Sequence, residues 1–536
     1  MKKKYIYTSI LLSLLTIVGC QDMDTFPGGD TVTSNQKDEV AELNPDRAEA
    51  GVNSIFANFS QYMPNKAALN ASRHNDIGYP TIMLCTDTNG NDVISDDNGY
   101  NWTGYDLNFE DRVYTMYECQ MIWNNLYGII YATNNVTASI NSETQDPLEQ
   151  KFVGQALAAR AFSYWVLAQL YQFNYSGHES APCVPIVTDK NVDEVTLNGA
   201  KRSTVKEVYT QILSDINTAI NLLVSSEENG ESRADKRYIS AGVAYGLRAR
   251  INLTMQQWDD AAKDATKAIE LSENEGIDVG TIKEVSKPTF WSMDEINWMW
   301  GIKIAETDEV VSSGIVNWIS HMGSLNYGYA NYSGGRQINK KLYATIPDTD
   351  ARKGWWLNEQ KTSKNLTADQ QSWMNRYKAY TQCKFGPYND VIGQSVNAND
   401  IPLMRIEEMY LIKAEAEAMS GQDGKTTLVN FIRTYRDPEY TCSAVSANDI
   451  QEEIFRQRRI ELWGEGMNWF DIMRLNKGID RRGCGYPNAT MIFNIPAGDG
   501  ILLWRIPEAE IQANPALNDA DNNPSSPTPT PVPDVE

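Results

Sequence analysis

Apolar residues recur every three or four positions in several stretches of the chain, and this spacing predicts helices with one buried face. In residues 151–172 one such face consists of Leu157, Ala161, Tyr164, Ala168 and Tyr171. A second helix is predicted in residues 203–223, with Ser203 as its N-cap. Its apolar face would carry Val208, Ile212, Ile216 (or Asp215), Ala219 and Leu223.

Small residues mark a helical hairpin in residues 238–271. The first helix would carry Gly242, Gly246 and Ala249, and the second Trp258, Ala261, Ala265 and Ala268. Small side chains let two antiparallel helices approach closely. The spacing from Ala249 to Ala261 and Ala268 is similar to that of a tetratricopeptide hairpin, although any helical hairpin would also fit. A later helix is expected in residues 402–421.

Two long stretches, 73–106 and 285–400, lack helical periodicity and are rich in Gly, Asn, Asp and aromatic residues. Loops of this length in a compact protein are usually functional or disordered, and the aromatic content argues against disorder. Within the second stretch Trp298, Trp300 and Ile302 alternate, which predicts a strand with one buried face and places both tryptophans in the core. The expected fold is mainly α-helical, with helix pairs supporting a loop-rich lobe and a few short strands.

The N-terminus resembles a bacterial lipoprotein signal. Lys2, Lys3 and Lys4 precede an apolar run from Ile10 to Val18, which is too short to span a bilayer and is followed by Gly19 and Cys20. We expect residues 1–19 to be removed and Cys20 to be diacylated, since two acyl chains anchor a protein stably. An ordinary cleavage site with a chance cysteine is the alternative.

The remaining chain divides into three segments. Residues 20–45 are polar and predict a lipidated flexible leash, residues 46–518 a single domain, and residues 519–536, rich in Pro, Ser and Asp, a disordered tail. No later stretch is long and apolar enough to span a membrane.

The net charge of the chain restricts the classes of partner that it can bind. Beyond residue 19 the chain has 44 basic and 70 acidic residues, a formal charge of −26. Such a surface repels phosphate backbones, so a nucleic-acid partner is not expected. Besides Cys20, six cysteines remain, without a CxxC pair, so they do not predict a zinc site; export would permit disulfides, and 15 pairings are possible.

Motifs of common catalytic and metal sites are absent. The chain has three histidines and no HExxH, GxSxG, P-loop or GxGxxG motif. Residues 87–92, DTNGND, approach a calcium loop, but Asp92 stands where the turn glycine belongs and Asn98 where the bidentate glutamate belongs. A hydrolytic carboxylate pair is possible, and no spacing singles one out. We therefore expect no cofactor, no metal and no enzymatic activity.

Aromatic and amide side chains gather in the non-periodic stretches, at RHNDIGYP (73–80), NGYNWTGYD (98–106) and SHMGSLNYGYANYSGGR (320–336). Aromatic rings can stack on the C–H faces of a sugar, while Asp, Asn and Arg bind its hydroxyl groups. Each ring could instead pack its loop onto the body, because aromatic residues are usually buried. For the set as a whole we favour a binding surface.

Residues 452–478 alternate arginines and acidic residues with large apolar ones. Read as one helix, Phe455, Arg459, Leu462, Gly466, Trp469 and Met473 share a stripe. Arg458 with Glu461, and Asp471 with Arg474, lie one turn apart and are expected to pair. Arg459, inside the apolar stripe, is expected to be partly buried and paired. The near balance of charge indicates a structural role.

The stretch RRIELWGEGMNWFDIMRLNKG (458–478) resembles the C-terminal signature of the SusD/RagB family. LAARAFSYWVLAQLYQ (157–172) is similar to its early helix, DTDARKGWW (348–356) to its middle segment and RIPEAEIQANPALND (505–519) to its closing segment. The sequence Gln21-Asp22-Met23-Asp24 resembles the export tag of surface lipoproteins.

The resemblance implies four tetratricopeptide-like helix pairs and a non-catalytic, surface-exposed lipoprotein of the outer membrane. It would capture a nutrient, usually a glycan, and pass it to a TonB-dependent SusC-like transporter. By region, the resemblance points to a ligand site at Asp76, Tyr79, Trp102, Tyr327 and Tyr329, with Arg73 and Asn75 next. The alternatives are a peptide-binding member or scaffold of the same family, and a surface glycoside hydrolase.

Overall fold

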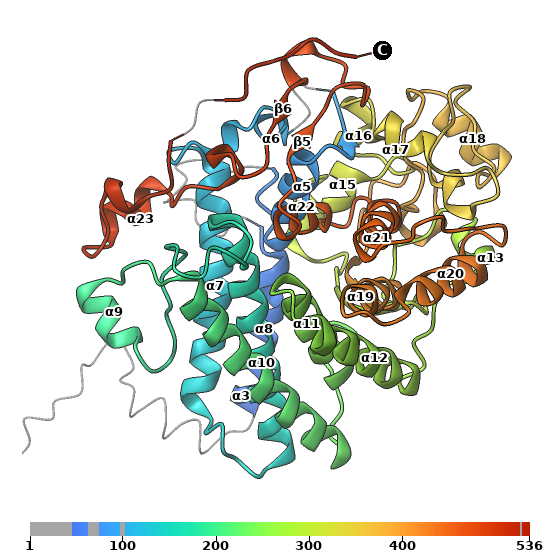
Figure 1. Cartoon of the computed structure of the whole chain (residues 1–536). Helices are drawn as coiled ribbons and strands as arrows, with labels where there is room; N and C mark the ends of the chain where they lie inside the picture. Colours follow the sequence, from blue (N-terminus) through green and yellow to red (C-terminus); the bar gives the residue numbers. More distant parts are fainter. Residues whose placement is uncertain (1–45, 63–73, 97–101, 526–527, 536) are drawn as a thin grey trace, which may run out of the picture. The chain divides into compact units, whose positions relative to one another are not determined.

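The computed structural model describes residues 46–62, 74–96, 102–525 and 528–535. The predicted lipidation site Cys20 and the predicted ligand residue Arg73 lie outside these ranges. Within these ranges, the residues from Ala50 onward form one compact unit, which is mainly α-helical with short strands, as the sequence predicted (Figure 1).

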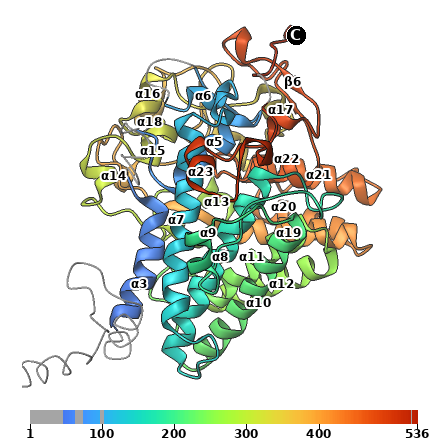
Figure 2. The ribbon, with the colours of Figure 1, turned by 90° about the vertical axis from the view of Figure 1, so that its left-hand side faces the viewer.

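Long helices that pack in chain order form the frame. They are α7 (Tyr117–Ser139), α8 (Pro147–Tyr171), α10 (Val205–Glu228), α11 (Ala241–Thr254), α12 (Trp258–Asn274), α19 (Ile406–Met419), α20 (Gly424–Tyr435) and α21 (Ala447–Glu461). α8 packs between α7 and α10, and α11 pairs with α12; α19 packs against α12, α20 and α21. In Figures 1 and 2, α7, α8 and α10 run side by side. The frame is therefore a succession of helix pairs.

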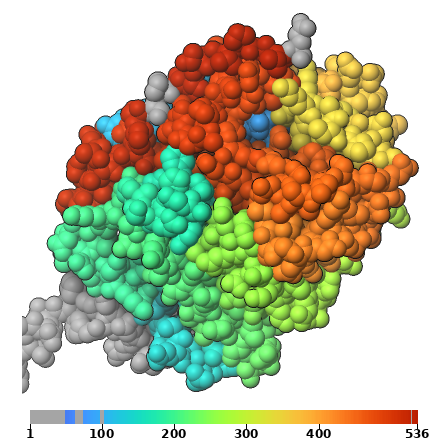
Figure 3. Space-filling view, viewed as in Figure 1, coloured from blue at the N-terminus to red at the C-terminus, as the bar shows by residue number. Residues whose placement is uncertain are grey.

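Shorter elements connect and cover this frame. The helices are α3 (Asp46–Ala57), α5 (Tyr79–Asn89), α6 (Gly104–Leu107), α9 (Val192–Asn198), α13 (Ile282–Val285), α14 (Glu309–Ser312), α15 (Trp318–Met322), α16 (Tyr329–Tyr332), α17 (Lys340–Ala344), α18 (Ala368–Met374), α22 (Asn468–Arg474) and α23 (Glu508–Ala513). On the face in Figure 3, green residues fill much of the lower half, and orange and red residues, with yellow ones at the right, fill the upper half.

α8 is the central helix of the frame. Asp146 caps it by accepting hydrogen bonds from the backbone N–H groups of Leu148 (2.9 Å) and Glu149 (3.2 Å), and Pro147 occupies its first turn. From Phe152 to Tyr171 every side chain is buried. The helix was predicted correctly, but the expectation of a single buried face was wrong, because neighbouring elements bury every side of it from Phe152 to Tyr171.

α10 begins one residue later than predicted. The N-cap is Thr204 rather than Ser203: its hydroxyl accepts from the backbone N–H of Glu207 (3.2 Å), and the Glu207 carboxylate accepts from the N–H of Thr204 (2.7 Å). This capping box satisfies two backbone donors that the helix leaves unpaired. The predicted apolar face is buried as expected, and Asp215 is buried with it.

α11 and α12 form the predicted hairpin, in which small residues allow close contact. A Cβ atom on Gly242 would lie 3.3 Å from Cβ of Leu271, and one on Gly246 would lie 2.6 Å from Sδ of Met404. Gly242 therefore lets α12 approach, whereas Gly246 makes room for a strand outside the hairpin. Ala249, Ala261 and Ala265 are fully buried.

Three two-stranded antiparallel sheets occur among the described residues. β1 (Val93–Ile94) pairs with β3 (Gln337–Ile338), β2 (Trp298–Ile302) with β4 (Ile401–Arg405), and β5 (Ile479–Asp480) with β6 (Asn494–Ile495). The prediction for β2 was correct in placing Trp298 and Trp300 in the core, where both are 0% exposed. It was wrong in giving the strand one buried face, because all five residues are buried.

The stretch 452–478 is not one helix. α21 ends at Glu461, and Gly464 (φ +76°) and Gly466 (φ +73°) turn the chain before α22 begins. A Cβ on Gly466 would lie 2.9 Å from Met83 in α5. Both glycines are therefore required for a turn in the left-handed region, and the predicted stripe of six residues does not exist.

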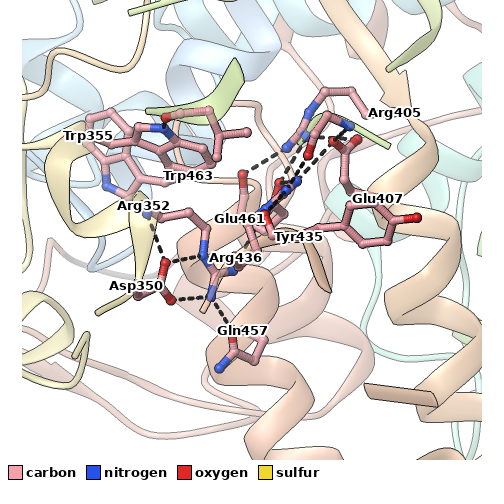
Figure 4. Close-up of polar contacts among 12 residues, drawn as sticks. Asp350, Arg352, Trp355, Arg405, Glu407, Tyr435, Arg436, Gln457, Glu461 and Trp463 are labelled. Atoms are coloured by element: carbon pink, nitrogen blue, oxygen red, sulfur yellow. Dashed lines mark hydrogen bonds and ion pairs between the residues drawn. The ribbon is translucent and has the colours of Figure 1, made fainter. Parts of the chain in front are cut away.

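The charged residues of this stretch form a buried network with arginines from elsewhere in the chain. Glu461, 0% exposed, accepts from Arg436 Nε (2.8 Å), Arg405 Nη1 (3.0 Å) and Arg352 Nη1 (3.2 Å), as Figure 4 shows. Burial alone would raise the pKa of Glu461, but the arginines, Arg436 foremost, hold it well below its usual value. We call Glu461, Arg352, Arg405 and Arg436 the arginine network.

Pairing within the stretch was predicted only in part. Arg458 pairs with Asp471 (2.7 Å) rather than with Glu461, because the turn brings α22 back onto α21. Asp471 and Arg474 pair as expected (2.8 Å). Arg459 is partly buried and paired, also as expected, and its partner is Asp92 (2.9 Å). Two acidic residues of the calcium-like stretch 87–92 thus have other roles: Asp92 forms this ion pair, and Asp87 is buried in α5.

The C-terminal segment, for which the sequence predicts a disordered tail, contacts the body of the protein at two described residues. Asn523 is buried and its Nδ2 donates to the carbonyls of Tyr171 (2.8 Å) and Trp504 (2.7 Å). Further on, Val532 N–H donates to Ile492 (2.8 Å), and its side chain packs on an apolar cluster. These few contacts fix a segment whose composition is otherwise polar.

Cysteine pairing, which the sequence left open, is settled for the six cysteines after residue 20. All are free thiols; Cys442 is half-buried and the others are buried. Burial raises the pKa of Cys383 to about 12 and that of Cys484 to about 11. Within the described ranges, no helix has both the length and the apolar character needed to cross a bilayer.

Candidate functional site

The first predicted binding stretch is a compact turn that leads into α5. Gly78 adopts φ +84°, and a Cβ there would lie 2.5 Å from the carbonyl oxygen of Phe59. Thr81 holds the turn, because its hydroxyl accepts from Ile77 N–H (2.9 Å) and donates to the Asn75 carbonyl. The stretch 73–106, predicted as loop, therefore contains the buried helix α5 as well as β1 and α6.

Rings from three distant parts of the sequence meet beside this turn. The His74 ring lies 4.5 Å from that of Trp102 and 5.6 Å from that of Tyr329, centroid to centroid. Trp102 meets Tyr329 edge to face at 5.9 Å, and His321 stacks on Tyr329 at 5.0 Å. The Tyr329 hydroxyl is hydrogen-bonded to His74 Nδ1. We call His74, Trp102, His321 and Tyr329 the aromatic cluster.

Buried polar groups hold the aromatic cluster in place. Asn75 Nδ2 donates to the Trp102 carbonyl (3.0 Å), and His321 Nε2 contacts the His74 carbonyl (3.2 Å). Arg336 donates to the His321 carbonyl (3.0 Å) and to the Thr103 hydroxyl (3.1 Å). Burial, assisted by the charge of Arg336, lowers the pKa of His321 to about 3. His321 is therefore a neutral ring at physiological pH.

A second pair of rings is exposed to solvent. Tyr327 and Tyr332, 41% and 47% exposed, lie edge to face at 6.0 Å, with their hydroxyl oxygens 2.8 Å apart. The backbone of Tyr327 is fixed by a hydrogen bond to the Gln394 carbonyl (3.0 Å) and another from Asn397 Nδ2 (2.9 Å). We call Tyr327 and Tyr332 the exposed tyrosine pair. It presents apolar ring surface together with hydroxyl groups.

The predicted ligand residues fall into three groups. Trp102, Tyr329 and Tyr327 belong to the aromatic cluster and the exposed tyrosine pair. Asn75 is fully buried and positions Trp102. Tyr79 is 4% exposed and packs on Phe59 and Phe162, so its ring is part of the core and we omit it from the binding surface.

Asp76 lies beneath the surface rather than on it. Its side chain is 2% exposed, and burial, together with the charge of Glu118, raises its pKa to about 7. A carboxyl group in this state is partly protonated at neutral pH. We therefore expect Asp76 to stabilise the turn before α5 rather than to contact a ligand.

Three residues of this region were missed by the prediction. His74, His321 and Tyr332 all lie in the stretches quoted above. His74 and His321 are 247 positions apart in the sequence, so nothing in the sequence indicated that they are in contact. Among the described residues, no group of three His, Cys, Asp or Glu side chains could hold a metal ion.

Comparisons with known proteins agree with this architecture. A family model described as "Starch-binding associating with outer membrane" matches residues 44–253, and one described as "SusD family" matches residues 317–524. A SusD-like protein of Formosa agariphila is 22% identical over 518 residues, covering 89% of this chain and 91% of the relative.

Solved structures share the fold. A SusD-like carbohydrate binding protein from Bacteroides vulgatus superposes with a TM-score of 0.72 at 23% identity, covering 90% of this chain and 98% of its own. A protein described as a laminarin binding SusD-like protein gives a TM-score of 0.59 at 17% identity, covering 90% of this chain and 100% of its own.

Proposed function

Because the chain belongs to the SusD/RagB family, we propose that it captures an oligosaccharide without catalysis and passes it to a TonB-dependent SusC-like transporter. The ligand contacts would come from the partly exposed His74 and Trp102 of the aromatic cluster and from the exposed tyrosine pair, whereas the buried rings of His321 and Tyr329 would support them. The protein would act at the cell surface, held in the outer membrane by a lipid on Cys20.

The observation that carries the proposal is the convergence of aromatic rings from separate loops. Trp102 from the early stretch meets Tyr329 from the middle region at 5.9 Å, and Tyr327 lies two residues from Tyr329. Rings held by buried hydrogen bonds lose little freedom when a ligand binds, which favours stacking on a sugar face. The exposed hydroxyl groups of Tyr327 and Tyr332 can bind sugar hydroxyls.

Relatives support the class of ligand. The protein from Bacteroides vulgatus is described as carbohydrate binding, and another structural relative as laminarin binding. A charge of −26 beyond residue 19 disfavours polyanionic ligands and favours a neutral glycan. Peptide binding and glycoside hydrolysis are the outcomes against which the proposal is tested.

The first experiment is isothermal titration of a soluble protein that begins after Cys20 against plant, fungal and host glycans, laminarin included. We expect binding without release of reducing ends. Tyr327→Ala should weaken binding at least about 10-fold, equivalent to about 1.4 kcal/mol, because it removes exposed stacking surface. Trp102→Ala should weaken it at least as much.

Tyr131→Ala is the matched control, since Tyr131 is 61% exposed and lies on α7, outside both groups of rings. It should leave the affinity unchanged. Binding that survives both loop substitutions would contradict the proposed site. Binding of peptides and not of glycans would favour the peptide-binding alternative. Release of reducing ends would favour the glycoside hydrolase.

A further inference from the structure

The loop 387–394 carries a second pair of partly exposed rings at its start. Tyr388 meets Trp291 edge to face, with the ring centroids 6.0 Å apart, and both side chains are partly exposed to solvent. We call Trp291 and Tyr388 the distal ring pair. Neither residue belongs to the aromatic cluster or to the exposed tyrosine pair, so the proposed ligand surface does not yet include them.

Backbone hydrogen bonds connect the distal ring pair to the exposed tyrosine pair. Val391 N–H donates to the Tyr388 carbonyl (3.2 Å), and Gln394 N–H donates to the Val391 carbonyl (3.2 Å). Tyr327 N–H then donates to the Gln394 carbonyl (3.0 Å). A turn closed by such a bond keeps its first and last Cα atoms within about 7 Å, so two turns keep Tyr388 within about 14 Å of Gln394. The two ring pairs are therefore neighbours on the loop side of the molecule.

The middle of the loop has an unusual backbone and an exposed apolar side chain. Asn389 and Asp390 adopt φ +53° and +59°, and the side chain of Val391 is 49% exposed. Successive residues other than glycine in the left-handed region are uncommon and unfavourable, and such residues cluster at ligand sites. The loop thus keeps apolar surface in solvent, along the chain between the distal ring pair and Gln394.

Contacts near both ends fix the loop to the body of the protein. Gly393 adopts φ +75°, and a Cβ there would lie 2.8 Å from the Trp373 ring. Trp373 Nε1 donates to the Ser324 carbonyl (2.8 Å), and the buried Asn399 donates from Nδ2 to the Gly386 carbonyl (2.9 Å). A loop that is fixed before binding loses little freedom when a ligand arrives, which favours affinity.

Two exposed glutamates at or just before the start of α14 link the distal ring pair to the aromatic cluster. Burial, and then a hydrogen bond with Glu306, raises the pKa of Tyr388. Burial, and then the charge of Glu309, raises the pKa of Tyr62. Tyr62 in turn adds to the effect of burial in raising the pKa of Tyr329. The glutamates thus reach Tyr388 on one side and the surroundings of Tyr329 on the other.

This combination of groups suits a neutral glycan chain. The rings can stack on the C–H faces of sugar units, and the glutamate carboxylates can accept hydrogen bonds from sugar hydroxyls while repelling acidic sugars. One sugar unit is about as wide as one aromatic ring. A ligand that contacts both ring pairs must therefore be a chain of several units.

We propose that Trp291 and Tyr388 form a further glycan subsite, which continues the surface of the exposed tyrosine pair along the loop 387–394 and binds the far end of a neutral chain. The inference rests on the proposed function of glycan capture, and it adds the residues that select for chain length. A short sugar would contact one ring pair only and would bind more weakly.

The test is isothermal titration of the chain that begins after Cys20 with the trisaccharide and the hexasaccharide of the laminari-, cello-, malto-, xylo- and manno- series. We expect at least one series in which the hexasaccharide binds at least about 10-fold more tightly than the trisaccharide. Tyr388→Ala and Trp291→Ala should each reduce this difference to less than about threefold and leave the affinity for the trisaccharide unchanged.

Two controls separate a lost subsite from a disturbed fold. Tyr388→Phe keeps the ring and should keep the wild-type affinity for the hexasaccharide. Tyr131→Ala removes an exposed ring from α7 and should change neither affinity. Because Tyr388 is partly exposed, Tyr388→Ala should keep the wild-type melting temperature, so the test holds even where Trp291→Ala lowers it.

Tyr327→Ala distinguishes this inference from the proposed function. It should weaken the binding of both lengths. If it does so while Tyr388→Ala and Trp291→Ala bind the hexasaccharide as the wild type does, the further subsite is overturned and glycan capture stands. If no series binds, or if Tyr327→Ala changes neither affinity, the proposed site fails and the further subsite fails with it.

Discussion

Two sets of buried carboxyl groups respond to burial in opposite ways. Glu461 is held by three arginines, and its pKa lies well below the usual value. Asp76 and Asp87 are also buried, but their pKa values rise to about 7 and about 8, because burial dominates and neighbouring acids add to it. The number of cations within reach decides the outcome.

The carboxyl group in the helical frame is therefore charged at neutral pH, whereas the one beneath the candidate binding surface gains its charge only as the pH rises through about 7. Glu461 lies at the end of α21, in the frame, whereas Asp76 follows the His74–Asn75 turn beneath the candidate surface. Because the pKa of Glu461 is lowered, its contribution to stability is present above pH 4.5 and is lost only in strong acid. Because that of Asp76 is raised, its contribution is present below pH 3.8 and is lost as the pH rises through about 7.

Glu461→Gln should have the largest effect, because it leaves Arg352, Arg405 and Arg436 in the core with too little negative charge. Removing one partner of a buried ion pair typically destabilises a protein by about 3–5 kcal/mol. Urea denaturation at pH 7 measures the free energy of unfolding. A loss below about 1 kcal/mol would mean that the network does not depend on Glu461.

Asp76→Asn should have an intermediate effect that depends on pH. Between pH 5 and pH 8 the wild type should lose about 2–3 kcal/mol of stability through this group, and the variant should lack that part. Denaturation curves at several pH values measure it. Asp87 titrates in the same direction, so a residual slope should remain. Parallel pH profiles for the variant and the wild type would contradict the raised pKa.

Glu270→Gln should have the smallest effect and serves as the control for both substitutions. Its ion pair with Lys267 (2.9 Å) is solvent-exposed, with the Glu270 side chain 59% and the Lys267 side chain 40% exposed. Exposed pairs of this kind contribute about 0–1 kcal/mol. The same denaturation assay should show a change below about 0.5 kcal/mol at any pH from 5 to 8. A larger change would mean that the solvent exposure of an ion pair does not determine how much it contributes to the free energy of unfolding.

The frame could be predicted from the sequence where local signals agree with packing. The small residues of α11 and α12 and the apolar face of α10 are examples. The break between α21 and α22 was missed, although Gly464 and Gly466 are visible in the sequence, because charged and apolar residues continue the helical period across them. The arginine network could not be foreseen, since Arg352, Arg405 and Arg436 come from three distant segments.

The candidate site was predictable by region and not by residue. Composition drew attention to the stretches that contain Trp102 and Tyr327, but it could not separate exposed rings from core ones. Tyr79 is buried because a helix follows Gly78, and short-range composition gives no sign of that helix.

The free, buried thiols have a consequence for how the protein matures. A thiol whose pKa is raised to about 11 or 12 by burial, as in Cys484 and Cys383, carries little thiolate at neutral pH and reacts slowly with oxidants. Among the described residues, the six cysteines after residue 20 form no disulfide with one another. We therefore expect a reductant to leave the melting temperature of the described domain unchanged, because none of these six thiols contributes a cross-link to it.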